Sequence, residues 1–318
     1  MCFGFDGEGE LRRSLAEKGA LRRNVLRGTA AGAVGIAALG AGAMAAPAAA
    51  AGGHGHGRRR SIPHDRISIQ LYTLRDALGG EPGFDVVLTR LAQYGYEKVE
   101  LAGYYGRTAR ELRKFLDSLG IRATSSHDGI SDSASALHTK LENAATLGQK
   151  YVVVPYLASD KRSDWEMWAD QMNEEAQAAK RWGLRYGYHN HAHEFTTDLG
   201  GGLTPWEVLT ERLDPRYVHL EVDLYWAYTG GVNSGASDPD RFAIDVIREA
   251  PQRVRQFHVK DRDKATGDMC DLGTGVVDFP RIFRTHTVEE YIVENDTPDV
   301  SPLTSAAVGH LYLDHLEY

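Results

Sequence analysis

Cysteine is almost absent from this chain of 318 residues, and the charge balance leaves no excess of basic groups. The two cysteines, Cys2 and Cys270, are too few for a disulfide-stapled scaffold or a cysteine-based zinc site. With 36 Lys and Arg against 44 Asp and Glu, the formal net charge is −8, so the positive footprint of a nucleic-acid-binding protein is missing. We therefore expect no nucleic-acid partner, and any metal must be held by Asp, Glu or the 13 histidines.

Charged residues are also missing from one long stretch near the N-terminus. Arg22 and Arg23 precede an uncharged, Gly- and Ala-rich run over residues 28–53. This pattern predicts a twin-arginine export signal over residues 1–51 and a secreted or extracytoplasmic location, with no stable membrane association after cleavage. A transmembrane anchor is the alternative, although Gly and Ala give weak membrane hydrophobicity. Residues 52–65 are predicted to be a flexible linker.

The remainder, residues 66–318, alternates short β-branched or aromatic runs with segments of helical periodicity. Eight strands are predicted, at residues 67–73, 98–102, 121–126, 151–155, 184–190, 217–223, 254–260 and 291–294. The helical segments include residues 84–94, 108–118, 164–182, 205–213 and 239–250, with a short seventh helix at 279–286 and candidate caps at Thr108, Ser163, Thr204 and Asp238. Eight strand–helix units of this length predict a single-domain (β/α)₈ TIM barrel.

A doubly wound open sheet is the runner-up architecture. Such a sheet usually carries a glycine-rich phosphate loop after its first strand, whereas Gln70 to Arg75 contains no glycine. The barrel is therefore favoured.

Ionisable residues gather at the carboxyl ends of the predicted strands, where TIM barrels place their reactive groups. His189 and His191 are two residues apart and so share one face of a strand, while a lone His219 is expected to be a core residue. Four groups, His191, Asp223, His258 and Glu294, would be costly to desolvate together without a shared partner. A divalent cation supplies that partner, and this ligand chemistry suits Mn²⁺, Mg²⁺, Co²⁺ or Zn²⁺. A histidine with an ordinary pKa near 6.5 would then be a suitable base.

At these residues the chain resembles the sugar phosphate isomerase/epimerase family, the xylose isomerase-like barrels. The resemblance extends over residues 67–316 and is carried by three motifs in order: Tyr-His-Asn-His at 188–191, His-Val-Lys-Asp at 258–261, and Leu-Gly-x-Gly-x-Val-Asp-Phe at 272–279. It implies one divalent metal held by residues of strands five to eight.

Asp223, His258 and Glu294 match the family's ligands on the last three strands. The usual strand-five glutamate aligns with His189, so the resemblance implies that Glu194 replaces it, with His189 as the alternative fourth ligand.

The other assignments complete the expected site. His191 is the expected base, His189 and Lys260 are further catalytic candidates, and Lys260 has a rim ion pair with Asp261 as its alternative. The expected substrate contacts are Tyr72, Glu100, His127 and Trp226, the last as a wall for a sugar ring.

Three functions are weighed on this basis. The leading one is a metal-dependent isomerase or epimerase of a sugar or sugar derivative, acting by proton abstraction next to a polarised carbonyl. The alternative is a lyase that cleaves 3-oxo-glycosides or dehydrates a sugar derivative by β-elimination. The third is a non-catalytic sugar-binding barrel. The partner is a small sugar in each case, and a homo-oligomer or an oxidoreductase partner is left open.

Overall fold

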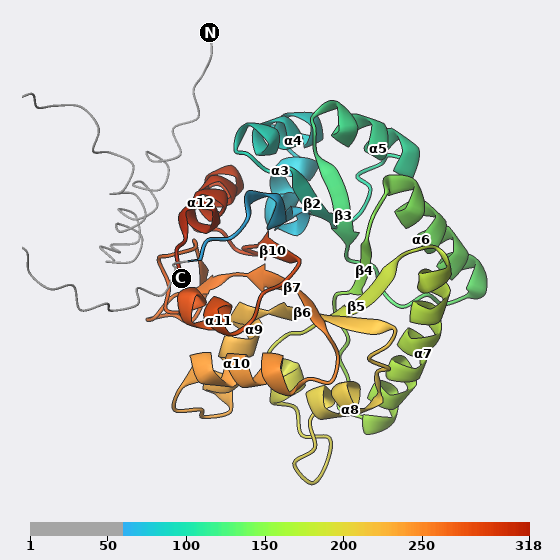
Figure 1. The fold of residues 1–318 in the computed structure, drawn as a ribbon, viewed down its shortest axis with the longest axis vertical. Coiled ribbons are helices and arrows are strands. Elements are labelled where there is room, and N and C mark those ends of the chain that lie inside the picture. Colours follow the sequence, from blue (N-terminus) through green and yellow to red (C-terminus); the bar gives the residue numbers. More distant parts are fainter. Residues whose placement is uncertain (1–59) are drawn as a thin grey trace, which may run out of the picture.

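Eight parallel strands surrounded by helices form the core of the computed structural model, which describes residues 60–318 (Figure 1). The strands are β1 Ile67–Gln70, β2 Lys98–Leu101, β3 Arg122–Ser126, β4 Tyr151–Val154, β5 Arg185–His189, β6 Val218–Asp223, β7 Val254–Val259 and β10 Glu290–Val293. Their order in the sheet is β3-β2-β1-β10-β7-β6-β5-β4. Pairing of the first strand with the last bends the sheet round on itself.

The two outer strands, β3 and β4, close this ring through isolated contacts. His127 forms a parallel bridge with Val153, and the backbone N–H groups of Lys150 and Asp128 donate to the carbonyls of Thr124 and Val153, both at 2.8 Å. The TIM barrel prediction is confirmed, and the open doubly wound sheet is wrong.

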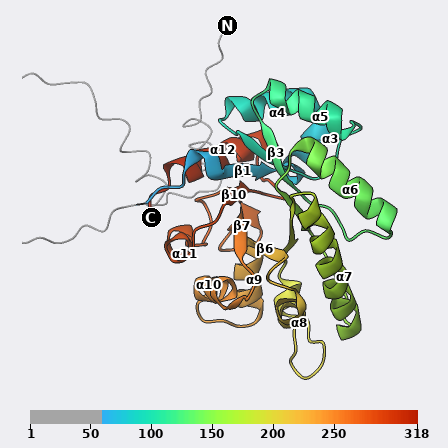
Figure 2. The same cartoon turned by 45° about the vertical axis from the view of Figure 1, so that its right-hand side comes forward.

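Helices cover the outside of the strands. They are α3 Arg75–Gly79, α4 Phe84–Gln93, α5 Ala109–Ser118, α6 Ala134–Leu147, α7 Arg162–Arg181, α8 Pro205–Arg212, α9 Leu224–Asn233, α10 Pro239–Glu249, α11 Phe279–Thr285 and α12 Pro302–His315. Figure 2 shows α6 and α7 along one side of the ring and α12 beside β1. Among the described residues, no helix combines the length and apolar character needed to cross a bilayer.

Three of the four predicted caps mark where helices begin. Thr108 and Thr204 each form a capping box with the glutamate three residues later, and Asp238 accepts from the backbone N–H of Arg241. Ser163 is wrong as a cap, because α7 already begins at Arg162. The seventh barrel helix, α11, is indeed short.

Two local features depart from the predicted strands. The first strand ends at Gln70, because the Gln70 side chain accepts from the backbone N–H of Tyr72 and starts the 3-10 helix Leu71–Leu74. After β7, a two-stranded hairpin of β8 Asp261–Arg262 and β9 Met269–Cys270 was not predicted.

The end of the predicted linker already belongs to the barrel. Arg60 and Tyr318 exchange backbone hydrogen bonds of 2.8 and 2.9 Å, Ile62 is buried, and a 3-10 helix spans His64–Arg66. The predicted export signal and the first part of the linker, with His54 and His56, lie outside the described residues.

Candidate metal centre

Alternate residues of the strands point into the barrel, and at the carboxyl ends these residues are ionisable. His189 ends β5, Asp223 ends β6, His258 lies near the end of β7, and Glu294 follows β10. One donor atom from each of these four buried residues lies within 4.8 Å of the others. The structure therefore brings together the ligand set expected from the sequence, with the alternative His189 in the fourth position.

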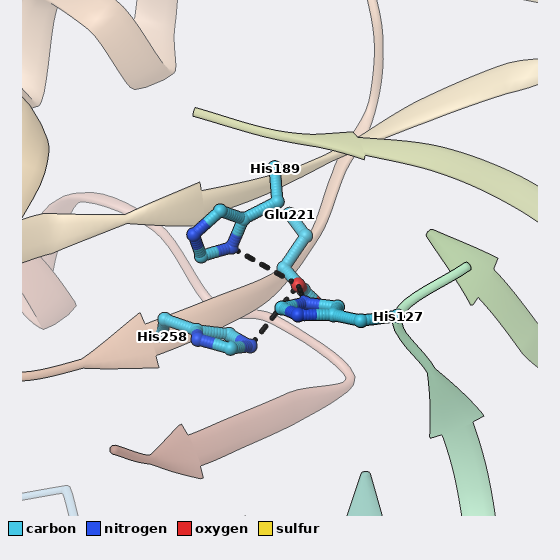
Figure 3. Close-up of side chains that lie close together, drawn as sticks. All are labelled: His127, His189, Glu221 and His258. Atoms are coloured by element: carbon cyan, nitrogen blue, oxygen red, sulfur yellow. Dashed lines mark hydrogen bonds and ion pairs between the residues drawn. The ribbon is translucent and has the colours of Figure 1, made fainter. Parts of the chain in front are cut away.

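A second group of donors lies beside the first and shares two members with it. It consists of His127, His189, Glu221 and His258, whose side chains gather around one Glu221 oxygen in Figure 3. That Oε1 atom lies 2.8 Å from His127 Nε2, 3.2 Å from His189 Nδ1 and 3.0 Å from His258 Nε2. Glu221 thus connects three imidazoles across the barrel.

The contact with Glu221 fixes the orientation of His189. When His189 Nδ1–H donates to Glu221, the lone pair of Nε2 stays free, and Nε2 lies 3.7 Å from Asp223 Oδ2. A carboxylate behind a metal-binding imidazole is the usual way in which proteins set the tautomer of such a ligand. Burial lowers the pKa of His189 to about 3, with the charge of His258 adding to the effect, so the ring is neutral.

His258 lies between two carboxylates. Its Nδ1 is 2.6 Å from Glu294 Oε2 and its Nε2 is 2.6 Å from Glu100 Oε2. Glu100 is fully buried and also accepts from Gln70 Nε2 at 2.8 Å and Ser125 Oγ at 2.5 Å. The structure therefore places Glu100, expected as a substrate contact, deep in the barrel as the partner of His258.

The two oxygens of Asp223 have different partners. Its Oδ1 accepts from the backbone N–H of Trp226 at 2.8 Å and caps α9. The Asn190 side chain makes two hydrogen bonds to the backbone of Asp223. Its Oδ1 accepts from the Asp223 N–H at 3.0 Å, and its Nδ2 donates to the Asp223 carbonyl at 3.3 Å. The Oδ2 atom of Asp223 makes no hydrogen bond to a described residue, but it forms an ion pair with the ammonium of Lys260, whose Nζ lies 3.1 Å away.

Lys260 joins three carboxylates at the mouth of the barrel. Its Nζ lies 3.1 Å from Asp223, 2.6 Å from Glu294 and 3.0 Å from Asp296. The alternative rim pair with Asp261 is wrong. The buried Asp261 carboxylate instead accepts from the backbone N–H groups of four residues: Arg262, Gly273, Gly275 and Val277. Asp261 therefore fixes the Leu-Gly-x-Gly loop.

Glu194 is fully buried but lies outside both donor groups. Its Oε1 accepts from the Tyr188 hydroxyl at 2.6 Å, and its Oε2 accepts from the backbone N–H of His191 at 2.8 Å. Both oxygens of the expected metal ligand are thus engaged, one by strand β5 and one by the loop that follows it.

His191 stands among aromatic rings next to the donor groups. Its ring centroid is 5.1 Å from those of His189 and Tyr156 and 5.3 Å from that of Trp226. Burial holds the pKa of His191 well below its ordinary value, so the ring is neutral but is not the base of ordinary pKa expected from the sequence. Its buried Nδ1 and the Nε1 of Trp226 find no hydrogen-bond partner in residues 60–318.

The remaining expected contacts lie in two places. Tyr72 is 45% exposed in the turn after β1, under the guanidinium of Arg75, whereas His127 is stacked on His258 inside the barrel. Glu221 and Asp296 were not predicted as site residues. Glu221 lies two positions before Asp223 and so faces the same way, which is the signal that could have found it.

The charge of the site fits a divalent cation. Five carboxylates meet here, from Glu100, Glu221, Asp223, Glu294 and Asp296, against the single ammonium of Lys260 and the imidazoles. Burial of so many negative charges is costly without further positive charge, and the donor atoms of His189, Asp223, His258 and Glu294 lie close enough together to share one ion. Two carboxylates and two imidazoles are a donor set that suits a divalent transition metal.

Comparisons with known proteins agree with this architecture. A family model described as a xylose isomerase-like TIM barrel matches residues 88–290. An inosose dehydratase from Geobacillus kaustophilus is 25% identical over 292 residues, covering 75% of this chain and 89% of that protein.

Two solved structures share the fold. A sugar phosphate isomerase/epimerase from Parabacteroides distasonis has a TM-score of 0.65 and 23% identity, over 80% of this chain and 95% of that one. An IOLI protein with a bound zinc atom has a TM-score of 0.57 and 15% identity, over 77% and 95%.

Proposed function

Because the chain belongs to the xylose isomerase-like TIM barrel family, we propose that it is a divalent-metal-dependent carbon–oxygen lyase. The substrate is a sugar or cyclitol derivative with a carbonyl group, from which the enzyme removes the adjacent proton and expels a β-oxygen substituent as water or an alcohol. The convergence of His189, Asp223, His258 and Glu294 carries the metal part of this proposal.

The choice of a lyase rests on the named relatives. The isomerase or epimerase activity that leads the sequence-based hypotheses is not confirmed, whereas the β-elimination alternative fits the inosose dehydratases better. Both reactions begin with abstraction of a proton next to a carbonyl, so the same site serves either one.

A divalent ion held by His189, Asp223, His258 and Glu294 would supply Lewis-acid polarisation of the substrate carbonyl. His191 is the proposed base, since its neutral ring has a free Nδ1 close to this group. The C–H electron pair forms the new C=C bond as the β C–O bond breaks. The proton taken by His191 then passes to the departing oxygen, so the products are an enone and water or an alcohol.

Two neighbours complete the proposed pocket. The buried ammonium of Lys260 is placed to donate to oxygen atoms that gain negative charge in the reaction. Trp226 lies beside His191 and offers an aromatic face to a ring-shaped substrate. The roles of Tyr72 and His127 as substrate contacts remain part of the proposal.

Mass spectrometry of the products tests this function. The manganese-loaded protein is incubated in deuterated water with an inosose, with a 3-oxo-glucoside and with free ketoses, in separate reactions. A lyase yields a product lacking one water, or a released aglycone, from one of the first two substrates. Asp223→Asn is the inactive comparison, and Asp245→Asn on α10 is the matched control for the loss of a carboxylate.

The other outcomes would overturn the proposal. Deuterium uptake into a ketose without loss of mass from any substrate would identify an isomerase. No turnover at all, by protein that retains its metal, would favour the non-catalytic sugar-binding barrel.

We also propose that the enzyme acts outside the cytoplasm, on the strength of Arg22 and Arg23 before the uncharged run. Replacement of both arginines by lysine should retain the protein in the cytoplasm of a host with twin-arginine export. Equal export of both forms would contradict this.

A further inference from the structure

A concave site lies at the opposite end of the barrel from the donor groups, at the amino ends of β5, β6 and β7. The cavity measures about 270 Å³. The residues that bear charge or a ring nitrogen in its lining are Lys180, Arg185, Arg216, His219, Arg253 and Arg255. Arg185 begins β5, His219 is the second residue of β6, and Arg255 is the second residue of β7.

The charge of this site opposes that of the chain as a whole. Five lining residues are cationic, and Lys150, which is outside the lining, shares the carboxylate of Glu289 with two of them, Arg185 and Arg255. Facing them are two carboxylates, Glu289 and Asp214. A surplus of positive charge in a concavity focuses the field there and attracts anions, in a chain whose net charge is −8.

Several of these cations donate hydrogen bonds to the carboxylate of Glu289. Its carboxylate accepts from Lys150 Nζ at 2.5 Å, from Tyr151 Oη at 2.7 Å, from Arg185 Nη1 at 2.8 and 2.9 Å, and from Arg255 Nη1. Both arginines use Nη1 for this contact, so the rest of each guanidinium fork remains for a second acceptor.

Two further cations, Lys180 and Arg253, make no hydrogen bond to a carboxylate of the described residues. Arg253 is 4.0 Å from Glu289 and its side chain is 68% exposed. Lys180 lies over the Tyr217 ring, 4.9 Å from its centroid. The floor includes His219, which is 3% exposed and whose Nδ1 makes no hydrogen bond to any described residue. Because the Nε2–H of the neutral His219 ring donates to Gln256 Oε1, its Nδ1 is an acceptor, and the cationic donors approach the cavity from its rim.

We propose that this cavity binds a small polyvalent oxyanion, of which inorganic phosphate is the simplest example. Several guanidinium N–H groups and one ammonium around a small space match the tetrahedral array of acceptor oxygens on such an anion. Lys180 and Arg253, the latter only 4.0 Å from Glu289, supply charges that make no hydrogen bond to that carboxylate, and Arg185 and Arg255 supply further N–H groups.

This site is separate from the metal centre and does not depend on the proposed lyase activity. His219 Nε2 pairs with Gln256 Oε1 at 3.0 Å, and Gln256 in turn contacts Glu290 at 3.3 Å. A layer of polar side chains inside the barrel therefore lies between the anion site and the imidazoles above it.

Titration calorimetry with sodium phosphate, at an ionic strength held constant with chloride, tests the proposal on the full chain. The wild type should bind one phosphate saturably. The double variant Lys180→Glu with Arg253→Glu should bind at least about ten-fold more weakly, because charge-assisted hydrogen bonds are lost. The double variant Lys114→Glu with Arg241→Glu, which changes the net charge equally at exposed sites on α5 and α10, should bind like the wild type.

An Asp223→Asn background separates this site from the metal centre, where phosphate could also bind. Saturable binding that persists in this background supports the pocket. Binding that disappears with Asp223→Asn, that is equal in the Lys180/Arg253 variant, that falls equally in the Lys114/Arg241 control, or that is absent in the wild type would overturn the proposal.

Discussion

Glu194→Gln is the substitution that best distinguishes between Glu194 and His189 as the fourth metal ligand. Glu194 is fully buried, with one oxygen on the Tyr188 hydroxyl and the other on the backbone N–H of His191. A glutamine can keep both contacts, because its carbonyl accepts from the N–H while its amide donates to the hydroxyl oxygen. Only the charge assistance is lost, which is worth about 1 kcal/mol for each hydrogen bond. We expect the free energy of unfolding to fall by no more than about 2 kcal/mol.

Glu194→Ala provides the graded comparison. It leaves two buried donors without an acceptor, at about 1–3 kcal/mol each, so we expect a loss of about 4 kcal/mol. Urea unfolding followed by circular dichroism measures both losses. Elemental analysis after desalting should find a full complement of metal in Glu194→Gln and little in His189→Ala. A metal-free Glu194→Gln protein beside a metal-replete His189→Ala protein would refute the assignment of His189.

Three further predictions concern single side chains. His191→Ala should retain the ion and lose the elimination reaction, and full turnover by this variant would reject His191 as the base. Glu221→Gln should weaken metal affinity about 10- to 100-fold, measured by chelator competition, because His189 loses its charged partner; unchanged affinity would contradict that role. Although burial opposes it, hydrogen bonds from Lys150, Tyr151 and Arg255 hold the pKa of Glu289 well below its ordinary value. Ionised Glu289 therefore contributes its full share of the unfolding free energy above the unfolded-state pKa of about 4.3. This contribution is lost as the pH falls through the lower pKa of the folded state. Glu289→Gln should flatten this acid-side decline in unfolding free energy, and an unchanged slope would contradict it.

Local sequence pattern was sufficient to predict most of the fold and three of the four residues of the candidate metal centre. The alternation of apolar and polar residues along β6 and β7 places Asp223 and His258 inside the barrel, whatever their partners are. Glu294 could be placed because it follows the last strand. These assignments require only local pattern and the rule that barrel strands are parallel.

Contacts between distant segments could not be read in the same way. Glu100 and His258 are 158 positions apart, and only the closed barrel brings them within 2.6 Å. The choice between His189 and Glu194 depends on the 3-10 turn His193–Phe195, which directs the Glu194 carboxylate back to Tyr188. The end of β1 similarly depends on one side-chain contact of Gln70.

Anomalous X-ray diffraction from crystals of the metal-loaded protein tests the central claim most directly. The account predicts one peak about 2.0–2.3 Å from donor atoms of His189, Asp223, His258 and Glu294. A peak bound to Glu194 instead, or one that lies beyond the reach of Asp223 and His258, would contradict it.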